Sequence, residues 1–133
     1  MLDISRMGAK YIDKFAKKIE KPWGYELIFA HTPKYAGKLI FVTGGHRLSL
    51  QYHKKKDETL YVYQGKAVIE IGEDEGRMVQ LEVSKGDRVR IRPLTRHRFT
   101  AMEDTTVFEV STPELDDVKR LADDYGRVSS EPR

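Results

Sequence analysis

Nine short stretches rich in β-branched and aromatic residues follow one another along most of the chain, and their spacing limits the possible folds more than any other feature. They are Tyr25–Ala30, Lys38–Val42, Arg47–His53, Glu58–Tyr63, Lys66–Ile71, Met78–Val83, Arg88–Ile91, His97–Met102 and Thr106–Val110. Turn-forming residues such as Gly44-Gly45 and Lys85-Gly86 separate them. Many short strands at this spacing predict an all-β sandwich or barrel.

Helical periodicity is confined to the two ends of the chain. Apolar residues recur at intervals of three and four from Ile4 to Ile19, which predicts an amphipathic N-terminal helix that Pro22 ends. A shorter periodic run from Leu115 to Ala122 predicts a short C-terminal helix that ends near Gly126. We therefore expect an N-terminal helical segment at 1–20, a β domain at 21–127 and a disordered tail at 128–133.

The composition is that of one ordinary globular domain. The chain has 133 residues, 39% of them hydrophobic, a formal net charge of +3 and no cysteine. A small net charge on a mixed surface argues against nucleic-acid binding, and no apolar run is long enough to cross a membrane. A cytoplasmic location is expected because no signal-peptide pattern begins the chain. Without cysteine, any metal site must use nitrogen and oxygen ligands.

The stretch Arg47–His53 carries a row of polar side chains. Alternate residues of a strand share one face, so Arg47, Ser49, Gln51 and His53 are expected on the same side. Glu58 opens the next stretch, and His97 opens a distant one that a closed sandwich can bring to the same point. Two imidazoles, one carboxylate and one amide oxygen suit a divalent transition metal such as Zn, Mn, Fe, Ni or Co. The alternative is that both histidines are ordinary hydrogen-bonded strand residues.

The same residues resemble the first sequence motif of the cupins. Its glycine, ligand and acidic positions are matched by Gly45, Gln51, His53, Glu58 and Gly65, with Gln51 standing where many cupins have a histidine. The resemblance implies a single double-stranded β-helix, a jelly-roll barrel with a metal at its centre.

The second cupin motif is matched in its spacing and altered in its loop. Gly86 and His97 stand at the family's glycine-to-histidine distance. Arg92-Pro93-Leu94 replaces the usual Pro-x-Gly, and Ala101 stands where asparagine is common. We therefore expect an unusual loop before His97 with the ligand position kept.

A closer resemblance is to the cupin domain of type II phosphomannose isomerases, a domain that often follows a mannose-1-phosphate guanylyltransferase. Four segments carry it: Lys21-Pro22-Trp23-Gly24, Arg47–His53, His97-Arg98 and Asp123–Arg127. Glutamine in place of the first histidine is typical of this subfamily. The similarity runs from about Lys21 to Arg127 and includes no nucleotidyltransferase domain.

This resemblance implies a metal-dependent sugar-phosphate isomerase that interconverts mannose 6-phosphate and fructose 6-phosphate through a metal-held enediolate. A base must move a proton between C1 and C2, and strand alternation makes Lys56 and Glu109 the candidates. Arg47 and Lys38 are the candidate cations for the phosphate. Zinc is the expected metal, a small anionic sugar or sugar phosphate the expected ligand, and a homodimer the expected assembly.

Two other functions fit the same residues. A cupin of another reaction class, such as an oxygenase or an epimerase-like enzyme, would bind a different diol or acid at the same metal. A non-catalytic sugar- or anion-binding module would keep the cavity without turnover. Metal content and an assay with mannose 6-phosphate separate these functions.

Overall fold

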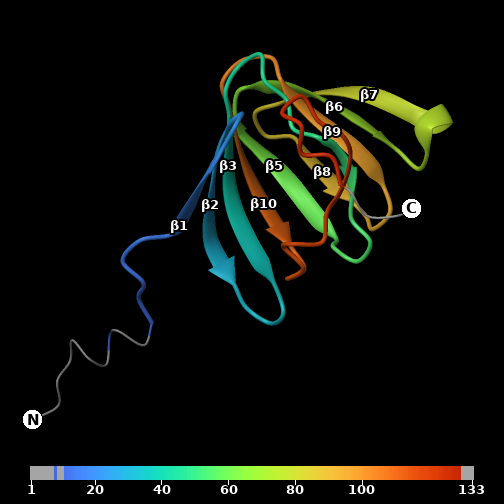
Figure 1. Cartoon of the computed structure of the whole chain (residues 1–133). Coiled ribbons are helices and arrows are strands. Elements are labelled where there is room, and N and C mark those ends of the chain that lie inside the picture. The colour runs from blue at the N-terminus through green and yellow to red at the C-terminus, as the bar shows by residue number, and fades with distance from the viewer. Residues whose placement is uncertain (1–7, 9–10, 130–133) are drawn as a thin grey trace, which may run out of the picture.

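The computed structural model describes residue 8 and residues 11–129, and the regular secondary structure of this part of the chain consists almost entirely of antiparallel strands (Figure 1). They are β1 (Lys17–Lys21), β2 (Gly24–His31), β3 (Ala36–Val42), β4 (Leu50–Tyr52), β5 (Glu58–Gln64), β6 (Lys66–Gly72), β7 (Met78–Ser84), β8 (Arg88–Ile91), β9 (Arg96–Ala101), β10 (Thr105–Ser111) and β11 (Lys119–Ala122). One short 3-10 helix, η1 (Glu75–Arg77), precedes β7. No helix in the described residues has the length and apolar composition needed to cross a membrane.

The strands form two sheets that face each other. The six-stranded sheet has the order β1-β2-β3-β10-β5-β8, and the five-stranded sheet has the order β11-β4-β9-β6-β7. Strands distant in sequence are neighbours, since β10 lies between β3 and β5, and β9 lies between β4 and β6. This interleaved antiparallel order is that of a jelly roll, so the predicted all-β architecture is confirmed.

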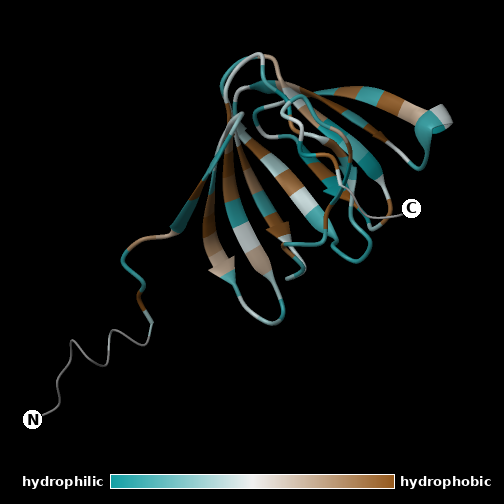
Figure 2. Cartoon of the chain, viewed as in Figure 1, coloured by the Kyte–Doolittle hydropathy of each residue, from teal (hydrophilic) through white to brown (hydrophobic). Residues whose placement is uncertain are grey.

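The apolar core lies between the sheets because inward and outward residues alternate along the strands. Figure 2 shows hydrophobic and hydrophilic bands alternating along several of them. The most completely buried large side chains are branched ones, Val42, Val62, Ile69, Ile91 and Val107. Burying such side chains stabilises the sandwich by about 1.5 to 3 kcal/mol each.

The predicted N-terminal helix is wrong over residues 12–20, although Gly8 is helical. Residues 4–7, 9 and 10 lie outside the described residues, residues 12–16 are not helical, and Lys17–Lys21 form β1. This strand pairs with β2, with Lys17 opposite Ile28. Strand pairing overrides the local helical periodicity. Phe15, which the helical pattern would bury, is 90% exposed, and its segment leads away from the sheets (Figure 1).

A tight turn joins β1 to β2 and anchors this hairpin in the sandwich. Pro22 and Trp23 form the turn, and Trp23 enters the core with an exposed fraction of only 2%. A β-carbon at Gly24 would collide with the carbonyl oxygen of Phe41 on β3, so this position requires glycine. The motif Lys21-Pro22-Trp23-Gly24 therefore has a packing role at the edge of the sheet.

The predicted C-terminal helix is also wrong. Leu115 and Asp116 form a turn, and Lys119–Ala122 form β11, which pairs with β4. The segment is extended because it completes the edge of the five-stranded sheet, a pairing that its own periodicity does not reveal. Of the predicted tail, Val128 and Ser129 are described, and residues 130–133 lie outside the described residues.

Candidate metal centre

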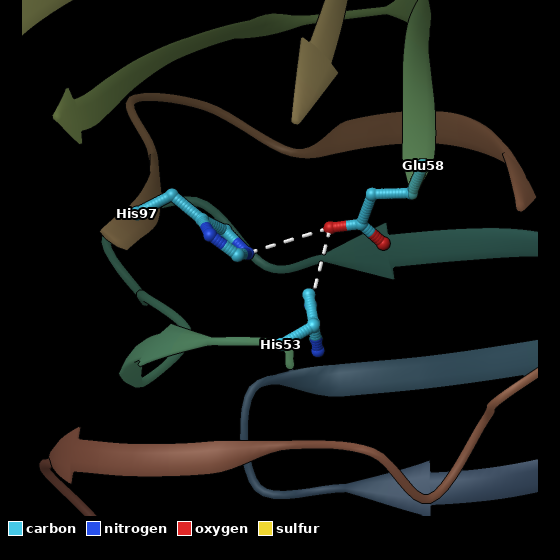
Figure 3. Close-up of side chains that lie close together, drawn as sticks. All are labelled: His53, Glu58 and His97. Carbon is cyan, nitrogen blue, oxygen red and sulfur yellow. Dashed lines mark ion pairs between the residues drawn. The ribbon is translucent and has the colours of Figure 1, made fainter. Parts of the chain in front are cut away.

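His53, Glu58 and His97 come together inside the sandwich from three separate places in the chain. His53 follows β4, Glu58 opens β5 and His97 lies in β9. One ligand atom from each lies within 4.8 Å of the others, and all three residues are buried. Glu58 Oε1 is 3.4 Å from Nε2 of each imidazole, as the dashed lines in Figure 3 show. The structure thus brings together three of the four predicted ligands.

Backbone carbonyls orient both imidazoles. His53 Nδ1 lies 2.5 Å from the carbonyl oxygen of Asp117, and His97 Nδ1 lies 3.0 Å from that of Thr95. A carbonyl only accepts a hydrogen bond, so each Nδ1 carries the proton and each Nε2 of a neutral ring presents a lone pair. Both lone pairs face the carboxylate oxygen of Glu58. Three acceptors aimed at one another need a cation between them, either a proton that lets an imidazole donate to Glu58 or a metal ion.

Gln51 is the fourth predicted ligand. It lies opposite His97 in the register between β4 and β9, and it lines the same cavity as the three buried residues. As a metal ligand, its amide oxygen would add a second oxygen donor to the two imidazoles and the carboxylate. These donor types fit a divalent transition metal ion.

Lys56 links Glu58 to a second buried carboxylate. Its Nζ lies 2.9 Å from Oε2 of Glu58 and 2.9 Å from Oε2 of Glu109 on β10. Burial disfavours the charged form of Glu58, but the contacts with His53 and His97 and the charge of Lys56 hold its pKa well below the ordinary value. Burial and the charge of Glu58 raise the pKa of Glu109 to about 8. The two carboxylates beside one ammonium therefore differ in proton affinity.

Lys38 lies in the cavity and is already paired. Its Nζ is 3.1 Å from Oε1 of Glu26 on β2, and both side chains are largely buried. The register between β3 and β10 places Lys38 beside Glu109. A ligand that contacts Lys38 therefore also meets its counter-ion, Glu26. The sequence did not predict this ion pair.

Arg47 does not line the cavity, contrary to the prediction from strand alternation. The strand covers only Leu50–Tyr52, and Arg47 makes an isolated bridge to Thr100 instead of extending it. Its guanidinium donates hydrogen bonds of 2.7 and 2.8 Å to the carboxylate of Asp124, and neither residue borders the cavity. The alternation rule fails because it holds only where the backbone stays in a regular strand.

The cluster opens onto a cavity of about 1150 Å³ between the sheets. Apolar core residues form part of its wall, and seven lysines or arginines line it against five aspartates or glutamates. A cavity of this size accommodates a small molecule, and its charge favours an anionic one.

Asp117 is a site residue that sequence reasoning missed. Its carboxylate accepts hydrogen bonds from the backbone N–H groups of Lys54, Lys55 and Lys56, and its carbonyl accepts one from His53. Sixty-four positions separate Asp117 from His53, and no local pattern links them. Lys21 and Arg127 also line the cavity. Both lie in segments that resemble phosphomannose isomerases, Lys21-Pro22-Trp23-Gly24 and Asp123–Arg127, and this resemblance was the only signal in the sequence that pointed to them.

Comparison with known protein families explains this combination of fold and site. Residues 9–123 match the model of the family described as mannose-6-phosphate isomerase C-terminal, which is most of the chain. The chain belongs to this family. The resemblance to the cupin domain of phosphomannose isomerases, predicted from four segments of the sequence, is therefore confirmed. A search of curated proteins found no match.

Solved structures with a similar fold include other cupins. KdgF from Halomonas sp. is 26% identical with a TM-score of 0.64, over 77% of this chain and 97% of the KdgF chain. Bacillus subtilis oxalate decarboxylase, in a study of its Mn(II) centres, is 20% identical with a TM-score of 0.70, over 79% of this chain and 30% of that one. CapF with the inhibitor 3-isopropenyl-tropolone is 21% identical with a TM-score of 0.67, over 80% of this chain and 34% of that one. The last two show the fold alone, and this chain spans about a third of their length.

Proposed function

We propose that this protein is a metal-dependent isomerase that interconverts an aldose phosphate and a ketose phosphate, of the mannose 6-phosphate and fructose 6-phosphate type. One observation carries the proposal: two imidazole nitrogens and a carboxylate oxygen converge in a buried cavity that also contains the second carboxylate, Glu109. The family match supports the substrate class, because the family's description names mannose-6-phosphate isomerase.

Gln51, His53, Glu58 and His97 are the residues that would hold the metal. When bound, a divalent ion supplies Lewis-acid stabilisation of the negative charge that develops on the sugar oxygens. Zinc is our first choice, and Mn, Fe, Ni or Co are the alternatives. The Mn(II) centres of the structurally similar oxalate decarboxylase support a divalent ion in general terms.

Glu109 is the residue that we assign as the base. Lys56 is poorly suited to this role because its Nζ lies between two carboxylates, which outweigh the effect of burial and raise its pKa above the ordinary value. Glu109 lines the cavity, and a carboxylate with a raised pKa accepts a proton more readily than an ordinary one. Lys56 then acts as a positioning residue for Glu58 and Glu109.

Metal analysis of the purified protein and of alanine variants tests the first part of the proposal. We expect a bound divalent metal in the wild type and its loss in His53→Ala, Glu58→Ala and His97→Ala, with a smaller loss in Gln51→Ala. His46→Ala is the matched control, since His46 is exposed in the loop after β3. A wild type without metal affinity would contradict the proposal, and so would equal metal content in the control and the ligand variants.

An isomerase assay tests the reaction itself. We expect conversion of mannose 6-phosphate to fructose 6-phosphate that requires added Zn or Mn, and none with unphosphorylated mannose. The fold similarity to oxalate decarboxylase favours a cupin of another reaction class as the second candidate. Oxygen uptake would support an oxygenase, and thermal stabilisation by sugar phosphates without turnover would support a binding module.

We also infer a homodimer formed through the outer face of the six-stranded sheet. Tyr63 and Val110 are 53% and 59% exposed there, and the ring of Tyr63 lies 5.5 Å from that of Phe108. Exposed apolar side chains that cluster in this way are typical of interaction surfaces. Light scattering should give about twice the chain mass of 15.4 kDa, and Val110→Arg should give a monomer. A cytoplasmic location stays a prediction from the sequence.

A further inference from the structure

The two sheets have edge strands that each present a cation to the cavity. Lys21 ends β1, the edge of the six-stranded sheet, and Arg120 lies in β11, the edge of the five-stranded sheet. Both residues line the cavity, and so does Arg127 from the turn that follows β11. Positive charge therefore lines the cavity from the edge strand of each sheet.

These cations are close enough to repel one another. Burial lowers the pKa of Lys21, and the charges of Arg120, Lys38 and Arg127 lower it further against the opposing effect of Glu26. The pKa of Arg120 is also lowered, first by burial and then by the charge of Arg127, against the opposing effects of Asp123 and Glu26. Positive groups placed together in a half-buried site favour the binding of an anion.

The side chains of Lys21 and Arg120 differ from three other cations of the cavity, each of which is paired with a carboxylate. Lys38 is paired with Glu26, Lys56 with two glutamates, and Arg127 donates to the carboxylate of Asp123 at 2.9 and 3.0 Å. Within residue 8 and residues 11–129, the Lys21 ammonium and the Arg120 guanidinium make no hydrogen bond or ion pair. Their donors are free to bind a ligand.

Strand register relates this charged edge to the candidate metal centre. Arg120 lies opposite Gln51 between β11 and β4, and Gln51 lies opposite His97 between β4 and β9. Arg120 is therefore two strand spacings, about 10 Å, from His97 along one row of the sheet. A six-carbon sugar whose reacting carbons lie at the histidines can reach this edge with a phosphate on its far carbon.

We propose that Lys21 and Arg120 form an anion subsite that binds the phosphate group of the substrate, a role that rests on the proposed function. The guanidinium of Arg120 offers two parallel donors to phosphate oxygens, and the ammonium of Lys21 adds a point charge from the opposite sheet. Arg127, held by Asp123, contributes long-range charge. This subsite takes the place that the sequence assigned to Arg47 and Lys38.

Calorimetric titration of the metal-loaded protein with inorganic phosphate, mannose 6-phosphate and mannose tests the subsite. We expect both phosphates to bind, and Lys21→Gln and Arg120→Gln each to weaken them by about tenfold or more, the usual effect of losing a charged hydrogen bond. Mannose should be unaffected by either substitution. Arg120→Lys, which keeps the charge and loses the fork, should weaken phosphate binding less than Arg120→Gln.

Arg77→Gln is the control, because Arg77 is exposed in η1 and does not border the cavity. Circular dichroism and metal content should match the wild type in every variant. Unchanged phosphate affinity in both Lys21→Gln and Arg120→Gln would overturn the subsite, as would a wild type that binds no phosphate. The isomerase proposal is tested separately, by turnover of mannose 6-phosphate. If phosphate binding depends on Lys21 and Arg120 but no turnover occurs, the subsite is supported and the isomerase proposal is not.

Discussion

Asp117 holds His53 through its backbone carbonyl and the loop after His53 through its side chain. The carbonyl oxygen of Asp117 lies 2.5 Å from His53 Nδ1. The carboxylate of Asp117 accepts hydrogen bonds of 2.6 to 3.1 Å from the backbone N–H groups of the three residues that follow His53. Those residues include Lys56 and lead directly to Glu58. A residue near the C-terminus thus orders the loop between β4 and β5 and orients one candidate metal ligand.

Replacing this carboxylate should disturb both stability and metal binding. We expect Asp117→Ala to lower the free energy of unfolding by about 2 to 4 kcal/mol, because three backbone donors lose a charged acceptor. Metal affinity should fall about 10- to 100-fold, as is usual when a residue that orients a metal ligand is lost. Urea denaturation and metal competition measure the two effects. Asp116→Ala, at an exposed neighbouring position, is the control, and equal effects of the two substitutions would contradict the prediction.

The same carboxylate should make stability depend on pH. Burial disfavours its charged form, but hydrogen bonds from the backbone of Lys55, Lys56 and Lys54 outweigh burial and lower the pKa of Asp117. Its stabilisation is fully present above the unfolded-state pKa of about 3.9 and is lost as the pH falls through the lower folded-state value. The stability difference between wild type and Asp117→Asn should therefore be constant above about pH 5 and shrink in acid. Thermal unfolding at a series of pH values measures it, and a difference that does not change with pH would count against this origin.

Lys56 should be essential for stability because it neutralises two buried carboxylates. Lys56→Met leaves Glu58 and Glu109 without their ammonium partner, and removal of one member of a buried ion pair costs about 3 to 5 kcal/mol. Adding Glu109→Gln should restore part of the loss. Denaturant titration of the single and double variants measures this coupling. Lys55→Met, at an exposed position in the same loop, is the control, and a loss as small as in this control would disprove the role.

Glu109→Gln should separate catalysis from metal binding. If Glu109 is the base, its loss should lower kcat by about 10²- to 10⁴-fold, while metal content stays at the wild-type level. The mannose 6-phosphate assay and metal analysis measure the two quantities on the same sample. Glu70→Gln, on β6 and away from the cavity, is the control. A kcat equal to that of the control would exclude Glu109 as the base.

Replacing Leu94 with glycine should stabilise the fold. Its φ of 68° lies in the left-handed region, and its backbone N–H donates to the carbonyl of His53 at 2.6 Å. Its side chain is 62% exposed, so little burial is lost on removal. The left-handed conformation costs a leucine about 1 to 2 kcal/mol. A glycine avoids this cost, but the unfolded chain then has more conformational entropy to lose on folding, which offsets part of the gain. Leu94→Gly should therefore raise the free energy of unfolding by about 0.5 to 1 kcal/mol. Thermal unfolding measures the gain, and Leu81→Gly, in β7, should instead destabilise.

Several features of the site were predictable because they depend on short spans of sequence. Strand alternation puts Gln51 and His53 on one side, and a short loop leads from them to Glu58 at the start of β5. We expected these strands to form a hairpin, but β4 and β5 belong to opposite sheets, and the three residues are close because the loop connects the two sheets. The second cupin motif usually has glycine at the position of Leu94. The positive φ of Leu94 agrees with this, because glycine adopts such a conformation readily. The helices predicted at the two ends failed because β1 and β11 gain their hydrogen bonds from β2 and β4.

The sequence by itself determined the all-β class, the near-neighbour ligands and, through the cupin motifs, the position of His97. The tertiary structure alone decided which cations face the cavity. Lys38 is paired with Glu26, Arg47 turns to Asp124, and Lys21 and Arg120 line the cavity from the edge strands of the two sheets. The physical reason is that alternation predicts side-chain direction only within a regular strand. Which charges meet across a cavity depends on how the two sheets close, and that is set by pairing between distant parts of the chain.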